Sequence, residues 1–418
     1  MNAKERLLAA VEERQSELFD LLGQLIRINS ESFGTTGNEA EVAAFIKEYL
    51  KGIGVESELY SPDSVEGIKE SGDYLEGHNM GNRPDVTGVL RGKTRRSLML
   101  MSHSDTVPIG DESLWSFPPL SGEVRDGKVW GRGACDDKYG IAVGLFLMKL
   151  IKELGIELDY DYYFTAYSDE EYGGGNGSLG ACLKYKCDDY VNMDCKNFEL
   201  WVAGVGGGDV LFEIASDTPK GSAGDALMGL YILKKELDVF KEARKAELMG
   251  EELFRNTYIP DTSTIILEAK AGDDGNDLDK GRLLVEYFTN KSEKEIEVEF
   301  DALCESVNAK LKEIGFKIVK REMTTRFFHF VKSDYKNSNI VKKLTKAAKE
   351  AGGIDIVPSG AVLSDLSLIV KHGSPNAVGI GVGSAFDVYG GAHQRDEFIN
   401  CEKLLKFTKI MGSLLMDY

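Results

Sequence analysis

The segment 97–107, which reads SLMLMSHSDTV, constrains the fold more than any other part of this chain. An apolar run at 98–101 is followed by polar side chains, as in a buried strand whose carboxyl end meets a ligand. Helical periodicity at 138–154 and another apolar strand at 160–168 come next. Because strand, helix and strand follow in this order, the sequence predicts an α/β unit.

The middle of the chain has a different pattern. Its elements are expected in the order β-α-β-β-α-β, which is typical of a split βαβ domain. The expected strands are 207–216, 263–270, 281–289 and 315–330, and the expected helices are 221–254 and 293–314. Outside this region, helices are expected at 3–27, 38–53, 337–351 and 401–416, with strands near 354–358 and 376–382.

These patterns indicate two domains in 418 residues, which is more than one simple core usually holds. We expect a discontinuous catalytic α/β domain, residues 1–196 and 330–418. An inserted α+β domain of ferredoxin-like type is expected at 197–329. One continuous α/β domain is the alternative.

Composition excludes some classes of protein. The chain has 69 acidic and 50 basic residues, a formal net charge of -19, and no basic cluster of the kind that binds nucleic acid. No apolar run approaches the roughly 18 residues that cross a membrane, and the charged amino-terminal helix lacks the core of a signal peptide. The six cysteines form no CxxC pair. We therefore expect a cytoplasmic protein that binds neither nucleic acid nor membrane.

His103 and Asp105 lie at the end of the expected strand 97–107. A neutral imidazole is a good zinc ligand, and a carboxylate two residues along a strand lies on the same face and can hold the second ring nitrogen. Such a pair at a strand end is often incidental. It gains meaning only from other residues.

Two pairs of adjacent carboxylates follow. Asp136 and Asp137 lie in a Gly-rich loop, where neighbouring carboxylates are costly without a cation. Glu170 and Glu171 follow a strand; consecutive carboxylates point in different directions, so one can bind a metal while the other reaches a bound water. Each pair taken alone is equally consistent with a solvated acidic turn.

Two further residues complete the set. Asp194 follows a short apolar strand at 190–193, and His393 lies in the sequence GGAHQRDE. The chain has five histidines, and two of them, His103 and His393, occur in these patterns.

Together the five patterns resemble, in order and spacing, the zinc-dependent exopeptidase and deacylase family. This family includes acetylornithine deacetylase, succinyl-diaminopimelate desuccinylase, aminoacylase, the glutamate carboxypeptidases and bacterial dipeptidases. The NRPD sequence at 82–85 and the passage 115–133 agree with the family as well. The resemblance covers about 1–200 and 330–418, and it implies a mixed sheet flanked by helices. The inserted domain is similar to the family's lid and dimerisation domain in pattern, which implies a possible homodimer.

The resemblance also implies the metal ligands, two zinc ions per subunit being held by His103, Asp136, Glu171, Asp194 and His393. Asp136 would bridge both ions. His103 and Asp194 would hold one zinc. Glu171 and His393 would hold the other.

Three neighbouring residues take the remaining roles that the resemblance implies. Asp105 orients His103, and Asp137 follows Asp136 across a cis peptide. Glu170 is the general base, which takes a proton from water and delivers it to the leaving nitrogen. Nitrogen and oxygen ligands suit zinc, although cobalt or manganese could occupy such a site.

The sequence departs from the family in the lid. Family lids usually carry a histidine near the start of their first helix, which steadies the oxyanion in the partner subunit's site, but 215–225 contains none. His329 could replace it, although a structural role is the simpler interpretation. Arg282 and Arg326 are candidates for holding a substrate carboxylate, and each could equally be a surface residue. The Gly-rich segment 360–365 would line the pocket.

We therefore expect a hydrolase that cleaves an amide bond near a free carboxylate. The Asp136-Asp137-Lys138 sequence favours small peptides, and so a dipeptidase or carboxypeptidase, because deacylase-like members often have Asp-Met-Lys there. An N-acyl-amino-acid deacylase is the first alternative. A non-catalytic paralogue that retains its metals is the second.

Overall fold

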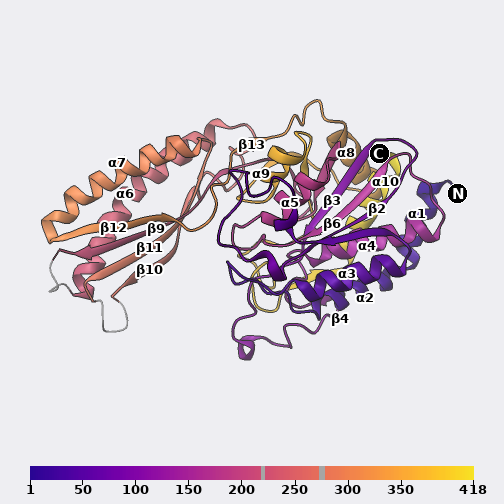
Figure 1. Ribbon diagram of the computed structural model, residues 1–418, viewed down its shortest axis with the longest axis horizontal. Coiled ribbons are helices and arrows are strands. Elements are labelled where there is room, and N and C mark those ends of the chain that lie inside the picture. Colours follow the sequence, from indigo (N-terminus) through magenta and orange to yellow (C-terminus); the bar gives the residue numbers. More distant parts are fainter. Residues whose placement is uncertain (218–221, 273–277) are drawn as a thin grey trace. The chain divides into compact units, whose positions relative to one another are not determined.

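The computed structural model describes residues 1–217, 222–272 and 278–418. The chain divides into two compact units (Figure 1). The first unit comprises Met1–Val202, Lys332–Pro358 and Leu368–Tyr418, and the second comprises Ala203–Val331 and Ser359–Ser367. The expected boundaries place 359–367 with the catalytic part, whereas here this segment belongs to the second unit.

Within the described residues, a nine-stranded sheet has the order β1-β2-β6-β3-β7-β15-β8-β13, with β14 paired to β8. Its strands are β1 (Glu56–Tyr60), β2 (Asp85–Leu90), β3 (Ser97–His103), β6 (Asp161–Tyr167), β7 (Asp189–Asn192), β8 (Leu200–Gly204), β13 (Val331–Lys332), β14 (Pro358–Ala361) and β15 (Val378–Ile380). β3 runs parallel to β6 and β7, whereas β2 runs antiparallel to β6. The sheet is therefore mixed, and the expected α/β class is confirmed.

Strand β3 lies in the interior of this sheet, and all of its residues are buried. This burial explains its near-continuous apolar sequence, because a parallel strand covered on both faces needs no polar alternation. Helix α4 (Lys138–Glu153) packs against β3, and most of its side chains are buried as well.

The other helices are α1 (Ala3–Glu13), α2 (Gln15–Ile26), α3 (Ala40–Gly52), α5 (Asn176–Lys184), α8 (Asn339–Gly352), α9 (Leu366–Leu368) and α10 (Cys401–Asp417). The single helix expected at 3–27 is wrong, because the chain leaves helical geometry at Arg14, where φ is -111° and ψ is 21°. The Arg14 guanidinium binds Glu17 and Glu153 at this break. Helical periodicity continues across the break, so the sequence pattern gave no sign of it.

A second, three-stranded sheet has the order β16-β5-β4. Its strands are β4 (Glu123–Arg125), β5 (Lys128–Trp130) and β16 (Phe398–Asn400). The antiparallel pairing of Phe398 with Trp130 joins a late segment of the chain to a much earlier one. Since β5 directly precedes the loop of Asp136 and β16 directly follows the loop of His393, this pairing brings the two loops together.

The second unit contains a four-stranded antiparallel sheet of order β10-β11-β9-β12. Its elements are β9 (Gly206–Ser216), α6 (Ala223–Gly250), β10 (Thr264–Ala271), β11 (Lys280–Thr289), α7 (Glu293–Leu311) and β12 (Phe316–Met323). Val210, Phe212 and Ile214 of β9 pack with apolar residues of both helices in one core. Alternate β9 side chains therefore point to the helix-covered face, as the period of two requires.

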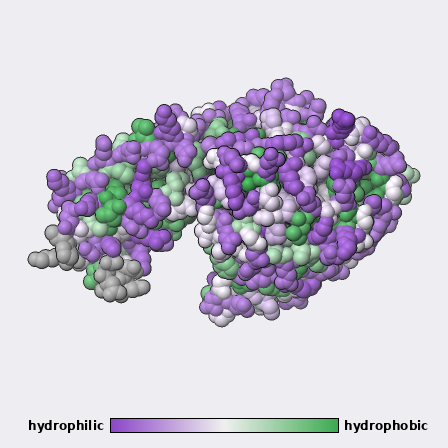
Figure 2. All heavy atoms as spheres, viewed as in Figure 1, coloured by the Kyte–Doolittle hydropathy of each residue, from purple (hydrophilic) through white to green (hydrophobic). Residues whose placement is uncertain are grey.

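Hydrophilic side chains predominate on the face of the protein shown in Figure 2. Among the helices of the described residues, none has both the length and the apolar character that a membrane span requires.

Candidate metal centre

Three parallel strands deliver the candidate site residues to one edge of the main sheet. β3 ends at His103, β6 is followed by Glu170 and Glu171, and β7 is followed by Asp194. Because β3 is hydrogen-bonded in parallel to both β6 and β7, their carboxyl ends lie side by side. This is the edge at which open α/β sheets bind ligands.

His103 lies at the centre of this edge and is completely buried. Its Nε2 is 3.0 Å from Asp136 Oδ1, and its Nδ1 is 3.0 Å from the backbone oxygen of Asp105 and 3.6 Å from the Asp105 carboxylate. Burial disfavours the imidazolium, yet the Asp105 and Asp136 carboxylates raise the pKa of His103 well above its usual value. The ring is therefore set in surroundings that favour a positive charge at its nitrogens.

Two groups of side chains in the described part of the chain are arranged to hold metal ions. One consists of His103, Asp136 and Glu171, and the other of His103, Asp137 and Asp194. In each group the potential ligand atoms all lie within 4.8 Å of one another. Both groups consist of imidazole and carboxylate donors, which suit zinc and other divalent cations.

His393 joins the first of these groups from the far end of the chain. Its Nε2 is 2.7 Å from Glu171 Oε2 and 3.3 Å from Asp136 Oδ2. Burial opposes a charge on the ring, whereas Glu171 and Asp136 raise the pKa of His393 to about 11. The two oxygens of Asp136 thus face different histidines, Oδ1 towards His103 and Oδ2 towards His393.

The peptide bond between Asp136 and Asp137 is cis. The Asp137 carboxylate is fully buried, and its Oδ2 accepts a hydrogen bond of 2.6 Å from Ser102 Oγ. Its other oxygen, Oδ1, has no hydrogen-bond partner. Burial raises the pKa of Asp137 well above its usual value, and the nearby Asp194 carboxylate raises it further. A buried carboxylate oxygen without a partner fits a bound cation.

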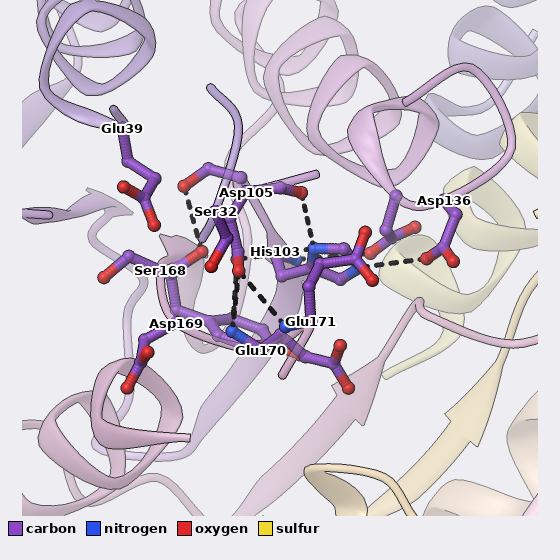
Figure 3. Close-up of polar contacts among 12 residues, drawn as sticks. Ser32, Glu39, His103, Asp105, Asp136, Ser168, Asp169, Glu170 and Glu171 are labelled. Carbon is purple, nitrogen blue, oxygen red and sulfur yellow. Dashed lines mark hydrogen bonds and ion pairs between the residues drawn. The ribbon is translucent and has the colours of Figure 1, made fainter. Parts of the chain in front are cut away.

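Asp105 organises the turn that carries the two glutamates. Its carboxylate accepts hydrogen bonds from the backbone nitrogen of Glu170 at 3.0 and 3.2 Å and from that of Glu171 at 3.1 Å (Figure 3). The Glu171 side chain is fixed separately, since its Oε1 accepts a hydrogen bond from Val107 N at 3.0 Å. The carboxylate beside His103 therefore also determines where the Glu170–Glu171 backbone lies.

A buried ion pair joins the loops of Asp136 and His393. Arg132 Nη1 is 2.6 Å from Glu397 Oε2, and the other oxygen of Glu397 accepts a hydrogen bond from Cys135 N at 2.9 Å. Arg132 also donates to the backbone oxygens of His393 and Gln394, at 3.4 and 3.3 Å. The pair was not foreseen, although both residues lie within five positions of a candidate ligand in the sequence.

The substrate-anchoring candidates lie in the second unit. Arg326 is buried, 2.7 Å from Asp365 Oδ1 and 3.2 Å from Ser367 Oγ, so its guanidinium is engaged within its own unit. Arg282 is half-exposed and pairs with Glu268 at 3.3 Å. The ring of His329 lies 5.4 Å from that of Phe327. Residues 218–221, part of the segment that lacks the lid histidine, lie outside the described residues.

Comparison with known proteins determines the family. The model of Peptidase family M20/M25/M40 matches residues 99–417. The chain belongs to this family. The expected resemblance is therefore confirmed, and the protein is a metallohydrolase.

Three relatives illustrate the breadth of the M20 family. An uncharacterized metallohydrolase of Methanocaldococcus jannaschii is 26% identical over 442 aligned residues, covering 96% of this chain and 98% of its own. The N-formyl-4-amino-5-aminomethyl-2-methylpyrimidine deformylase of Halalkalibacterium halodurans is 28% identical over 47% of this chain and 42% of its own. The crystal structure of the M20 family metallo-carboxypeptidase Sso-CP2 of Sulfolobus solfataricus superposes with a TM-score of 0.72 at 18% identity, covering 96% of this chain and 98% of its own.

Proposed function

We propose that this M20 protein is a two-zinc hydrolase that cleaves an amide bond in small peptides, as a dipeptidase or carboxypeptidase. The observation that carries the proposal is the pair of adjoining ligand groups that share His103. Because one imidazole would serve one ion, His103 would belong to the first ion, and His393, whose Nε2 is 2.7 Å from Glu171 Oε2, would supply the imidazole for the second. A glutamate that belongs to neither group, Glu170, lies next to Glu171 in the sequence.

The proposed ligands divide between the two ions in a definite way. Asp136 would bridge them, which is supported by its two oxygens facing His103 and His393. Asp194 would share the ion of His103, and Glu171 would share the ion of His393.

Asp137 is a further candidate for the first of these ions. It lies in the same group as His103 and Asp194, and its Oδ1 has no hydrogen-bond partner. The resemblance gave this residue no metal-binding role, so it extends the expected ligand set.

When bound, the two zinc ions would lower the pKa of a water molecule and polarise the scissile carbonyl. The proposed role of Glu170 is to accept the proton from that water and to donate it to the leaving nitrogen. The Asp105 carboxylate would orient His103 and hold the Glu170 backbone in place, since it faces both. Asp105 would thereby link the position of a proposed metal ligand, His103, to that of the proposed general base, Glu170.

The Glu170→Gln variant tests this division of roles. We expect it to bind two zinc ions per chain, as the wild type should, while losing most of its turnover, because general acid–base groups typically contribute about 10²–10⁴-fold. Zinc is measured by elemental analysis, and turnover is measured on dipeptides and N-acetyl amino acids in the presence of zinc, cobalt or manganese. Loss of zinc from the variant would contradict the role given to Glu170.

The same substrates test the alternatives. An N-acyl deacylase is supported by the similarity to the N-formyl pyrimidine deformylase, and hydrolysis of N-acetyl amino acids but not dipeptides would favour it. A non-catalytic paralogue is supported by the absence of a histidine from 215–225. Two bound metals without turnover on any substrate would establish that alternative.

We further propose that the second unit is a lid and dimerisation domain and that the protein is cytoplasmic. Support for a homodimer comes from large apolar side chains that are exposed on α6 (Leu227, Met228 and Tyr231) and on the edge strand β10 (Ile266 and Leu267). Sedimentation analysis should give a dimer, and a monomer at every concentration would contradict this. The six free cysteines are consistent with a reducing compartment.

A further inference from the structure

Arg83 is a fully buried arginine two residues before β2 in the first unit, and it has no part in the proposed chemistry. Its Nε is 2.6 Å from Glu39 Oε1, its Nη1 is 2.5 Å from Asp169 Oδ1, and its Nη2 is 3.5 Å from Asp105 Oδ2. The guanidinium also donates to Ser32 Oγ at 2.9 Å. We call Arg83, Glu39, Asp105 and Asp169 the Arg83 cluster.

The charges of the Arg83 cluster do not balance. Three carboxylates surround one guanidinium, and none of the four side chains is more than 2% exposed. Burial and the Asp105 carboxylate raise the pKa of Glu39 to about 8, and Glu39 Oε2 has no hydrogen-bond partner. An apolar core of the same volume would often be at least as stable as such an arrangement. Stability alone therefore does not account for the cluster.

Two of the three carboxylates in the Arg83 cluster, those of Asp105 and Asp169, shape the turn that carries Glu170. The Asp105 carboxylate accepts hydrogen bonds from the backbone N–H groups of Glu170 and Glu171 (Figure 3). Asp169 directly precedes Glu170 and has φ of 67°, in the left-handed region that non-glycine residues rarely adopt. Its carboxylate is held by Arg83 and also lies 2.7 Å from His78 Nδ1. The Arg83 guanidinium thus contacts both Asp105, whose carboxylate holds the backbone of this turn, and Asp169, whose left-handed conformation bends it.

We propose that Arg83 is a positioning residue, which fixes the turn 168–171 so that Glu170 reaches the water while Glu171 stays on the metal. The inference rests on the proposed function. Arg83 cannot be a metal ligand itself, because a guanidinium stays protonated and offers no lone pair, and it contacts Asp105 and Asp169 instead. Its effect on the reaction is therefore one of geometry.

The Arg83→Lys variant tests this role. Lysine keeps the charge, but a single ammonium on a flexible stem cannot reproduce the planar fork that joins Glu39, Asp169 and Ser32. We expect kcat to fall by about 10–100-fold, as for other residues that orient a metal site, with KM unchanged. Zinc content should remain at the wild-type value.

The matched control is Arg244→Lys. Arg244 is a buried arginine of the second unit that also binds two carboxylates, Glu247 and Glu299, each at 2.6 Å. This control should lose stability without a change in kcat. If Arg83→Lys folds poorly, Asp169→Asn serves instead, because asparagine tolerates the left-handed conformation while weakening the contact with Arg83; it should lower kcat in the same direction.

Several results would overturn the inference. An Arg83→Lys protein with wild-type kcat would do so, as would one that loses zinc in parallel with kcat. A crystal structure of the variant provides a readout that needs no activity: unchanged hydrogen bonds between Asp105 and the Glu170–Glu171 backbone would exclude a positioning role. If the wild type itself hydrolyses no substrate, the proposed function fails, and this crystallographic comparison still decides the role of Arg83.

Discussion

The Arg132–Glu397 pair provides a sharp test of how the loops that carry Asp136 and His393 are held together. Replacing Glu397 by glutamine removes one charge from a pair that is 4% and 0% exposed and leaves Arg132 buried without a counter-ion. Breaking a buried pair in this way typically costs about 3–5 kcal/mol. The side-chain oxygen of glutamine can still accept the hydrogen bond from Cys135 N, so we expect the lower end of that range, about 3 kcal/mol.

The loss should also reach the proposed metal centre, because Arg132 donates to the backbone oxygens of His393 and Gln394. Residues that orient ligands in this way usually affect metal affinity by about 10–100-fold. Urea unfolding of the zinc-loaded protein measures the stability, and competition with a chelating dye measures the zinc affinity. Both should fall together in Glu397→Gln.

A second variant tests whether the unpaired charge of Arg132 causes the loss of stability. The Arg132→Met, Glu397→Gln double variant contains neither charge, so it should recover part of the stability lost in the single variant. A cost below about 1 kcal/mol for Glu397→Gln, or a double variant no more stable than the single one, would refute the argument that the unpaired charge causes the loss.

Three further predictions concern other parts of the molecule. In the second unit, Asp209 and Glu286 lie opposite each other on β9 and β11; burial raises the pKa of Asp209 to about 6, and burial together with Asp209 raises that of Glu286 to about 7. Both values lie above the usual values of about 4, so the folded state binds the protons more tightly, and stability should fall as pH rises from about 4 to 7. Asp209→Asn should reduce this fall in urea unfolding at pH 5 and pH 8, and an unchanged difference between the two would contradict it. Gly144→Ala should destabilise the first unit by about 1–3 kcal/mol, because its Cβ would lie 2.2 Å from the Phe164 ring, whereas Gly52→Ala, with open space around it, should not. Removal of metal by a chelator should lower the unfolding midpoint, and zinc at about 1,000 times its Kd should restore about 4 kcal/mol; equal stability with and without zinc would count against a metal bound by the folded state.

The sequence was sufficient to predict the parts of the fold that rest on local pattern. The apolar run before His103 is strand β3, and α4, α8 and α10 begin within two residues of their expected starts. Periodicity carries this information because burial on one or both faces imposes it residue by residue. The break at Arg14 could not be predicted from periodicity, because it leaves the apolar spacing intact.

The contacts around the candidate site were harder to foresee. His103, Asp136 and Glu171 were singled out by residue type and position, and they do lie together. Glu39 was not, and Arg83 was noted only as part of the NRPD sequence at 82–85 without a role of its own, because the partners of Arg83 lie 44 and 86 positions away. Hydrogen bonds between such distant residues depend on the whole tertiary fold, and no local rule of spacing describes them.

The position of β15 in the main sheet has a consequence for how the protein is made. This strand lies between β7 and β8, although Val378–Ile380 follows them by more than 170 residues. During synthesis on the ribosome, the edges of β7 and β8 that pair with β15 remain unpaired until nearly the whole chain has emerged. Most of the second unit is contiguous in sequence and can therefore fold earlier. A polypeptide that stalls before residue 378 would therefore display a folded insert beside an unfinished sheet, a state that invites aggregation and that chaperones would have to shield.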